Sequence, residues 1–121
     1  MSIGVWAATA GVGGAGALAR FWLDGAIARR AGRSFPFGTL VINVTGAFVL
    51  GLLTGLALTG NALLIAGTAA IGSYTTFSTW MLESQRLVEE GAVGAAALNL
   101  LGSLVAGVAA AALGKAIGGW L

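Results

Sequence analysis

The sequence predicts an all-α membrane protein, a single domain of residues 1–121 with four transmembrane helices. Hydrophobic residues make up 58% of the chain and charged residues only 8%. The mean hydropathy is +0.96, and no charged residue occurs between Arg33 and Glu83. Because about 20 apolar residues span the hydrocarbon core of a bilayer, these observations indicate an integral membrane protein.

Four segments are long and apolar enough to be these helices, and short turns separate them. Thr59-Gly60-Asn61 is the turn between the second and third, and Glu89-Glu90-Gly91 marks the turn between the third and fourth. The predicted helices cover residues 3–28, 37–58, 62–87 and 91–118.

The third segment contains a polar stretch where a lipid-facing helix would carry only hydrocarbon. Residues 72–79 read Gly-Ser-Tyr-Thr-Thr-Phe-Ser-Thr and contain five serine and threonine hydroxyls. Such a stretch persists at membrane depth only where it faces protein or a water-lined path. The sequence therefore predicts that helix three is broken near its middle and that the break forms part of a permeation or binding site.

The second and fourth segments carry polar stripes. Thr39 and Asn43 are four residues apart and share a helix face, as do Asn99, Ser103 and Gly107. An amide in hydrocarbon is costly unless it is hydrogen-bonded, and the two donors of Asn43 could replace the water around an anion. An interhelical hydrogen bond explains Asn43 equally well, and both interpretations stay open.

Aromatic and charged residues near the break suggest further roles. Phe77 and Trp80 share one face, where their positive ring edges could meet an anion or the rings could simply pack. Thr79 and Glu83 share a face one turn further on, and Arg20 should reach the same side of the membrane. An Arg20–Glu83 pair at a vestibule and an ordinary surface ion pair are both compatible with this spacing.

The absent residue types exclude several functions. The chain has no cysteine and no histidine, so thiolate chemistry and the usual transition-metal ligands are missing. No carboxylate lies in the central part of a predicted helix, which argues against a small four-helix proton-coupled exporter. No histidine, central lysine or metal set could activate the hydroxyls, so an enzyme is not expected.

Basic residues predict the orientation of the chain. The first loop carries Arg29, Arg30 and Arg33, and Arg86 ends the third helix, whereas the opposite side has Lys115 and the terminal amine. The positive-inside rule places the arginine-bearing loops in the cytoplasm.

Glycine pairs at helical spacing allow two interpretations. Gly13 with Gly16 and Gly51 with Gly55 let helix backbones approach closely. They could form the interface of a dimer or pack helices within one subunit.

Three motifs in this order closely resemble the Fluc (CrcB) family of fluoride channels, over essentially the whole chain. They are residues 38–46 (GTLVINVTG), residues 75–79 (TTFST) and residues 13–20. The resemblance implies an antiparallel, dual-topology dimer of four-helix subunits in the inner or plasma membrane, surrounded by lipid. Two pores along the subunit interface would conduct fluoride passively and lower its intracellular level.

The resemblance also implies roles for individual residues. Asn43 and Phe77 would line the ion pathway with Thr39, Trp80 and Ser103, and Arg20, Thr79 and Glu83 would belong to the vestibule. The backbone carbonyls of Gly72 and Thr75 would bind a structural Na⁺ shared by both subunits. A broken helix does free carbonyl oxygens, which a hard cation prefers.

The chain departs from the family pattern at three positions. Trp80 replaces a second pore phenylalanine, Gly107 replaces a second hydroxyl on helix four, and Asn99 stands where an aromatic residue would be expected. With the roughly four-to-one bias of basic residues, these changes also suggest a subunit that is active only with a homologous partner.

Overall fold

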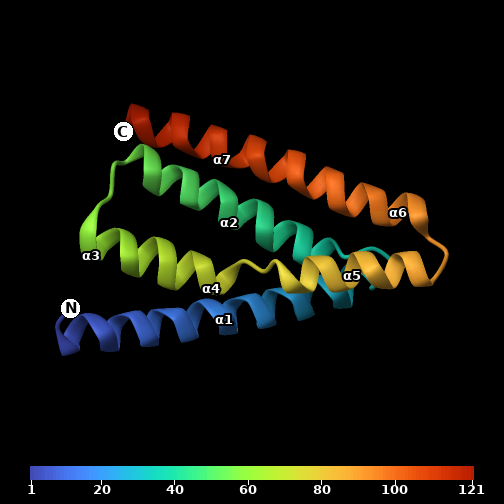
Figure 1. Ribbon diagram of the computed structural model, residues 1–121, viewed down its shortest axis with the longest axis horizontal. Helices are drawn as coiled ribbons and strands as arrows, with labels where there is room; N and C mark the ends of the chain where they lie inside the picture. The colour runs from blue at the N-terminus through green and yellow to red at the C-terminus, as the bar shows by residue number, and fades with distance from the viewer.

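The computed structural model describes all residues, 1–121, and contains helices but no strands (Figure 1). The chain forms four helical rods, in agreement with the predicted all-α fold. The first rod is α1 (Ile3–Ala31). Its N-cap is Ser2, whose hydroxyl accepts a hydrogen bond from the Val5 amide at 3.2 Å. The second rod is α2 (Phe37–Gly55). The third comprises α3 (Gly60–Leu63), η1 (Leu64–Ile71), α4 (Gly72–Tyr74) and α5 (Ser78–Glu89), and the fourth α6 (Val93–Ala97), η2 (Leu98–Gly102) and α7 (Ser103–Trp120).

The third rod is not continuous. Helix α4 ends at Tyr74, the backbone of Thr75 is extended with φ −78° and ψ 162°, and helical structure resumes at Ser78. Figure 1 shows the non-helical connection between α4 and α5. Threonine favours such a place because its hydroxyl competes for main-chain partners: Thr75 Oγ1 donates to the Ile71 carbonyl at 2.9 Å.

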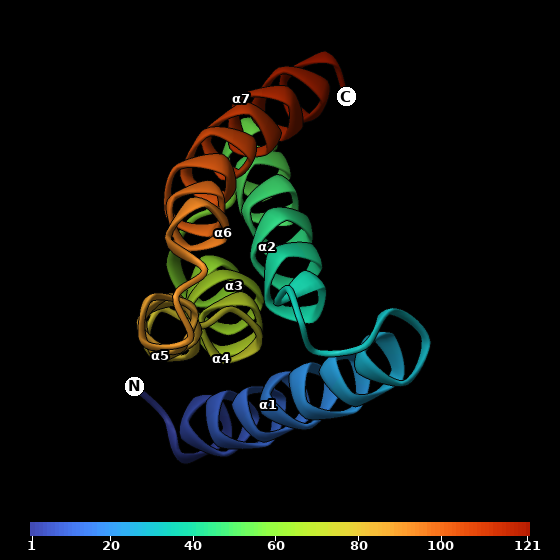
Figure 2. The same ribbon diagram turned by 90° about the vertical axis from the view of Figure 1, so that its right-hand side faces the viewer.

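Helix α2 packs closely against α7 through glycines (Figures 1 and 2). A Cβ atom at Gly51 would overlap the Ala111 carbonyl oxygen, and one at Gly55 would overlap the Lys115 carbonyl oxygen. On α1, a Cβ at Gly16 would press on the backbone of η1. The glycine pairs found in the sequence therefore pack helices within one subunit, which is the second of the two interpretations left open.

Much apolar surface faces outward. Only 15 of 121 residues are buried, while large side chains such as Trp22, Phe21 and Val105 are exposed. Exposed apolar surface on this scale marks contact with a membrane or a partner. Two helices are long and apolar enough to cross a membrane, Phe37–Gly55 and Val93–Trp120. The two other predicted spans correspond to α1, a glycine-rich helix that ends in arginines, and to the third rod, which is divided into short helices.

Candidate functional site

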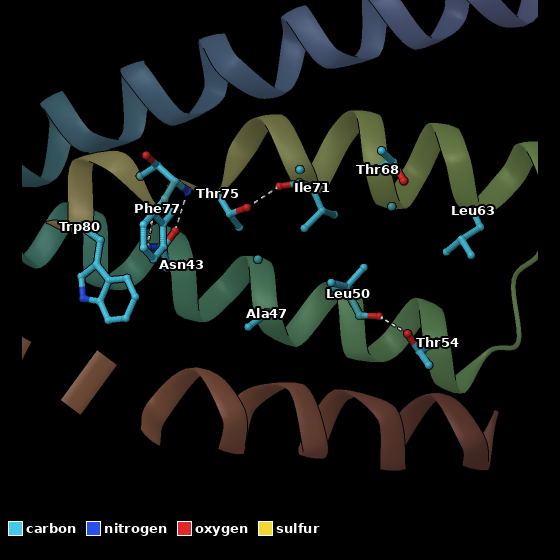
Figure 3. Close-up of a pocket in the computed structure, with 14 residues that line it drawn as sticks. Asn43, Ala47, Leu50, Thr54, Leu63, Thr68, Ile71, Thr75, Phe77 and Trp80 are labelled. Atoms are coloured by element: carbon cyan, nitrogen blue, oxygen red, sulfur yellow. Dashed lines mark hydrogen bonds between the residues drawn. The ribbon is translucent and has the colours of Figure 1, made fainter. Parts of the chain in front are cut away.

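The largest groove of the molecule lies between α2 and the interrupted third rod, with a volume of about 680 Å³. Figure 3 shows its lining, with Asn43, Phe77 and Trp80 near the interruption at one end and Leu63 and Thr54 at the other. It brings together five residues predicted to be functional: Asn43, Gly72, Thr75, Phe77 and Trp80.

Asn43 binds the peptide groups of the interruption. Its Nδ2 donates to the Thr76 carbonyl and its Oδ1 accepts from the Thr76 amide, each at 2.8 Å (Figure 3). Both main-chain groups would be costly to leave unpaired. The amide therefore makes the hydrogen bonds of the structural interpretation. Because Nδ2 carries a second hydrogen with no acceptor in the protein, a donor remains for a ligand.

Two aromatic rings stand at the polar end of this groove. Phe77 is 69% exposed, and its ring centroid lies 5.7 Å from that of Trp80 at an interplanar angle of 80°. Such an edge-to-face pair is a favourable arrangement for aromatic side chains. The indole Nε1 of Trp80 donates to the Asn99 carbonyl at 3.0 Å.

A second groove of about 260 Å³ continues along α7 and shares Asn43 and Trp80 with the first. Ser103 and Gly107 line it together with apolar residues of the same helix. The Ser103 hydroxyl donates to Asn99 Oδ1 at 3.4 Å, a long and weak bond. A Cβ atom at Gly107 would meet nothing within 4 Å, so the missing hydroxyl leaves open space in this groove.

The residues predicted for a vestibule are divided between two places. Arg20, Thr79 and Thr39 line a third cavity of about 240 Å³, and Arg20 Nη1 donates to the Thr75 carbonyl at 3.1 Å. Glu83 is not among the residues that line this cavity and instead accepts a hydrogen bond from the Thr39 hydroxyl.

One detail of the sequence interpretation therefore needs correction. Arg20 and Glu83 do not form an ion pair, because the arginine binds a carbonyl and the carboxylate binds a hydroxyl. Thr39 is only 2% exposed and lies at the third cavity, not in the grooves that contain Asn43, and its part in the ion pathway stays a prediction.

The interruption leaves main-chain oxygen atoms available to a cation. In a continuous helix the amides of Thr76 and Phe77 would bond to the carbonyls of Gly72 and Ser73, and neither bond forms. Free carbonyl oxygens suit a hard cation such as Na⁺. The Thr75 carbonyl also accepts from Arg20, so only one of its lone pairs is left. The Gly72 carbonyl is therefore available as one oxygen ligand for a cation, while the Thr75 carbonyl lies beside the positive charge of Arg20.

Sequence reasoning did not identify Ser84, and it left Asn99 without a partner. Asn99 is fully buried and its Nδ2 donates to Ser84 Oγ at 2.8 Å. The spacing of Ser84 four residues after Trp80 was the available signal, since it places both on one face of α5.

Comparison with known proteins identifies the family. The family described as "CrcB-like protein, Camphor Resistance (CrcB)" matches residues 7–115. A relative from Mycolicibacterium paratuberculosis, named "Fluoride-specific ion channel FluC 2", is 56% identical and covers 94% of this chain and 93% of its own. Relatives with that name from Mycobacterium tuberculosis (50% identical, 95% and 91% covered) and Haloarcula marismortui (53%, 78% and 77%) are similar too. The chain belongs to the CrcB-like protein family.

Proposed function

We propose that this chain is a subunit of a fluoride-selective channel that conducts fluoride passively across the cytoplasmic membrane and lowers its level in the cell. The observation that carries the proposal is the 56% identity, over almost the whole of both chains, with a relative named as a fluoride-specific ion channel. The names of the relatives support transport, not catalysis, as the activity of this chain.

The composition of the two grooves supports a path for a small anion. Fluoride is small and strongly hydrated, so a selective path must replace its water with hydrogen-bond donors at close range. Asn43 Nδ2 has a hydrogen free for fluoride, and the Ser103 hydroxyl becomes a second donor when it exchanges its long, weak bond to Asn99 for one to the ion. The edges of Phe77 and Trp80 add positive partial charge. Apolar side chains line the rest.

The same grooves favour a channel over a proton-coupled exporter. Neither groove is lined by an aspartate, glutamate, lysine or arginine, so no titrating group there can couple a proton to an anion. The third cavity is lined by both Arg20 and Asp24, so the opposite charges of these two side chains largely offset each other there.

An antiparallel dimer would complete the path. Phe77 is 69% exposed and large apolar side chains lie on the surface of the single chain, so the grooves lack a wall that a second subunit would supply. The arginine bias of the loops favours one orientation, and an oppositely oriented homologue would then be the partner. The dimer would span the membrane with four helices per subunit.

Fluoride efflux from liposomes tests the channel. With valinomycin carrying compensating potassium, the purified chain should release fluoride but not chloride, without a pH gradient. Phe77→Ile removes the ring edge and should slow efflux about three- to ten-fold, whereas Leu82→Ile, at a position that is also exposed, should not. Chloride release at a similar rate, or a requirement for a proton gradient, would contradict the proposal. Efflux only with a homologous subunit present would support the heteromeric form.

Structural sodium at Gly72 predicts an ion-dependent dimer. Replacing Na⁺ with N-methylglucamine should lower the dimer fraction measured by single-molecule photobleaching in liposomes. Without a cation between them, the carbonyl oxygens of the two subunits would repel one another. Gly72→Val should abolish this Na⁺ dependence by crowding the carbonyls. The control variant Gly94→Val, at a helical glycine where a Cβ would meet nothing within 4 Å, should retain it. A dimer fraction that is the same in both cations would refute the sodium proposal.

A further inference from the structure

A buried polar network joins α5 to the start of the fourth rod behind the aromatic pair. Its members are Trp80, Ser84, Asn99 and Ser103, and it is called the Asn99 network below. Asn99 Nδ2 donates to Ser84 Oγ at 2.8 Å, and Ser84 Oγ donates to the Trp80 carbonyl at 2.8 Å. The Trp80 indole Nε1 donates to the Asn99 carbonyl at 3.0 Å and closes the ring of contacts.

The burial of this network gives it rigidity. Asn99 is 0% exposed and Ser84 is 4% exposed, so water does not compete for their hydrogen bonds. A buried amide that lost these partners would be strongly destabilised, and satisfied networks in a low-dielectric interior hold their members in one arrangement. Trp80 is consequently fixed at two points, its main-chain carbonyl by Ser84 and its ring by Asn99.

The fixed indole determines what Trp80 presents to the two grooves that it lines. Its one donor, Nε1–H, is used by Asn99, so only carbon-bound hydrogens and the ring face remain for an ion. Phe77 meets this ring edge-to-face at 5.7 Å and is otherwise exposed. The position of the Phe77 ring therefore depends on that of Trp80.

We propose that Ser84 and Asn99 are positioning residues that hold the Trp80 ring, and through it the Phe77 ring, in place. In this position the two rings leave an ion path that is wide enough for fluoride and too narrow for chloride. The inference rests on the proposed channel function. Neither Ser84 nor Asn99 lines the two grooves, so Ser84 acts through Trp80, and Asn99 acts through Trp80 and through its weak bond to Ser103. Loosening the ring should let the larger anion pass and should weaken the contact with the smaller one.

Ser84→Ala is the direct test, with Asn99→Leu as a second variant and Ser84→Thr as the conservative rescue. The protein carries Trp6→Phe, Trp22→Phe and Trp120→Phe, three exposed positions, so that Trp80 is the only tryptophan and can be excited selectively. Ser84→Ala should red-shift the emission, lower its anisotropy and reduce the fluoride-to-chloride permeability ratio about three- to ten-fold, as expected for one lost hydrogen bond. Ser84→Thr keeps the hydroxyl and should restore both readouts.

The outcomes separate this inference from the proposed function. If the parent protein conducts no fluoride, alone or with a homologous subunit, the channel proposal fails and the inference fails with it. If the parent conducts and Ser84→Ala leaves either the permeability ratio or the Trp80 emission unchanged, the inference alone is overturned. A folded Asn99→Leu variant must lower the ratio as Ser84→Ala does, and an unchanged ratio there would also overturn it.

Discussion

Replacing Asn43 with leucine is expected to reduce fluoride efflux about a hundred-fold. The substitution keeps the size of the side chain but leaves the Thr76 amide and carbonyl without the partners that now lie at 2.8 Å. An unpaired main-chain group costs about 1–3 kcal/mol when buried, and two such groups cost enough to disfavour the present arrangement of residues 75–77. Because each 1.4 kcal/mol is a factor of ten, a hundred-fold loss follows. The initial rate of efflux from liposomes measures it.

Asn61→Leu is the matched control, since this asparagine is exposed near the start of the third rod and makes no side-chain hydrogen bond. It should conduct like the unmodified protein. Full conduction by Asn43→Leu would mean that neither the Thr76 contact nor the free Nδ2 donor is needed for the path.

The two roles considered for Asn43 show how far the sequence could be interpreted. Its type and its place in a predicted helix were enough to infer that it must be hydrogen-bonded or must face an ion. Its partner could not be inferred, because Thr76 lies 33 residues away and meets Asn43 only once the third rod is interrupted. Both roles can hold together, since one amide offers two donors.

Thr39 shows a different limit. Residues four apart on a helix share a face, but successive residues turn by about 100°, so the two side chains still diverge by about 40°. That divergence is enough to put Asn43 in the large groove and Thr39 in the cavity beside Arg20. Helical spacing therefore predicts a common face and not a common cavity.

The helices that the glycines contact could not be predicted from the sequence. Small residues at helical spacing predict that a backbone approaches closely, but they do not say which backbone. In the structure the neighbour of Gly51 is α7 of the same chain, and Gly114 on α7 lies against the Phe48 carbonyl of α2. This contact shows that the glycines pack helices within one subunit, and it predicts that substitutions there change the stability of the subunit.

Gly114→Ala is expected to lower the stability of the subunit by about 3 kcal/mol or more. Alanine favours a helix over glycine by about 1 kcal/mol, so propensity alone predicts a gain. The new Cβ atom would, however, overlap the Phe48 carbonyl oxygen and approach the Leu52 amide nitrogen at 2.9 Å. Main-chain atoms cannot rotate away, so α2 and α7 must separate and lose packing, which costs more than ordinary overpacking. The midpoint of unfolding by dodecyl sulfate in mixed micelles should fall accordingly.

Gly119→Ala on the same helix provides the opposite expectation. A Cβ atom there would meet nothing within 4 Å, so the gain in helix propensity should be unopposed and the midpoint should stay the same or rise slightly. The measurement must be made under conditions where the protein is monomeric, so that a dimer interface does not contribute. If Gly114→Ala and Gly119→Ala shift the midpoint equally, the close contact between α2 and α7 does not control the stability of the subunit.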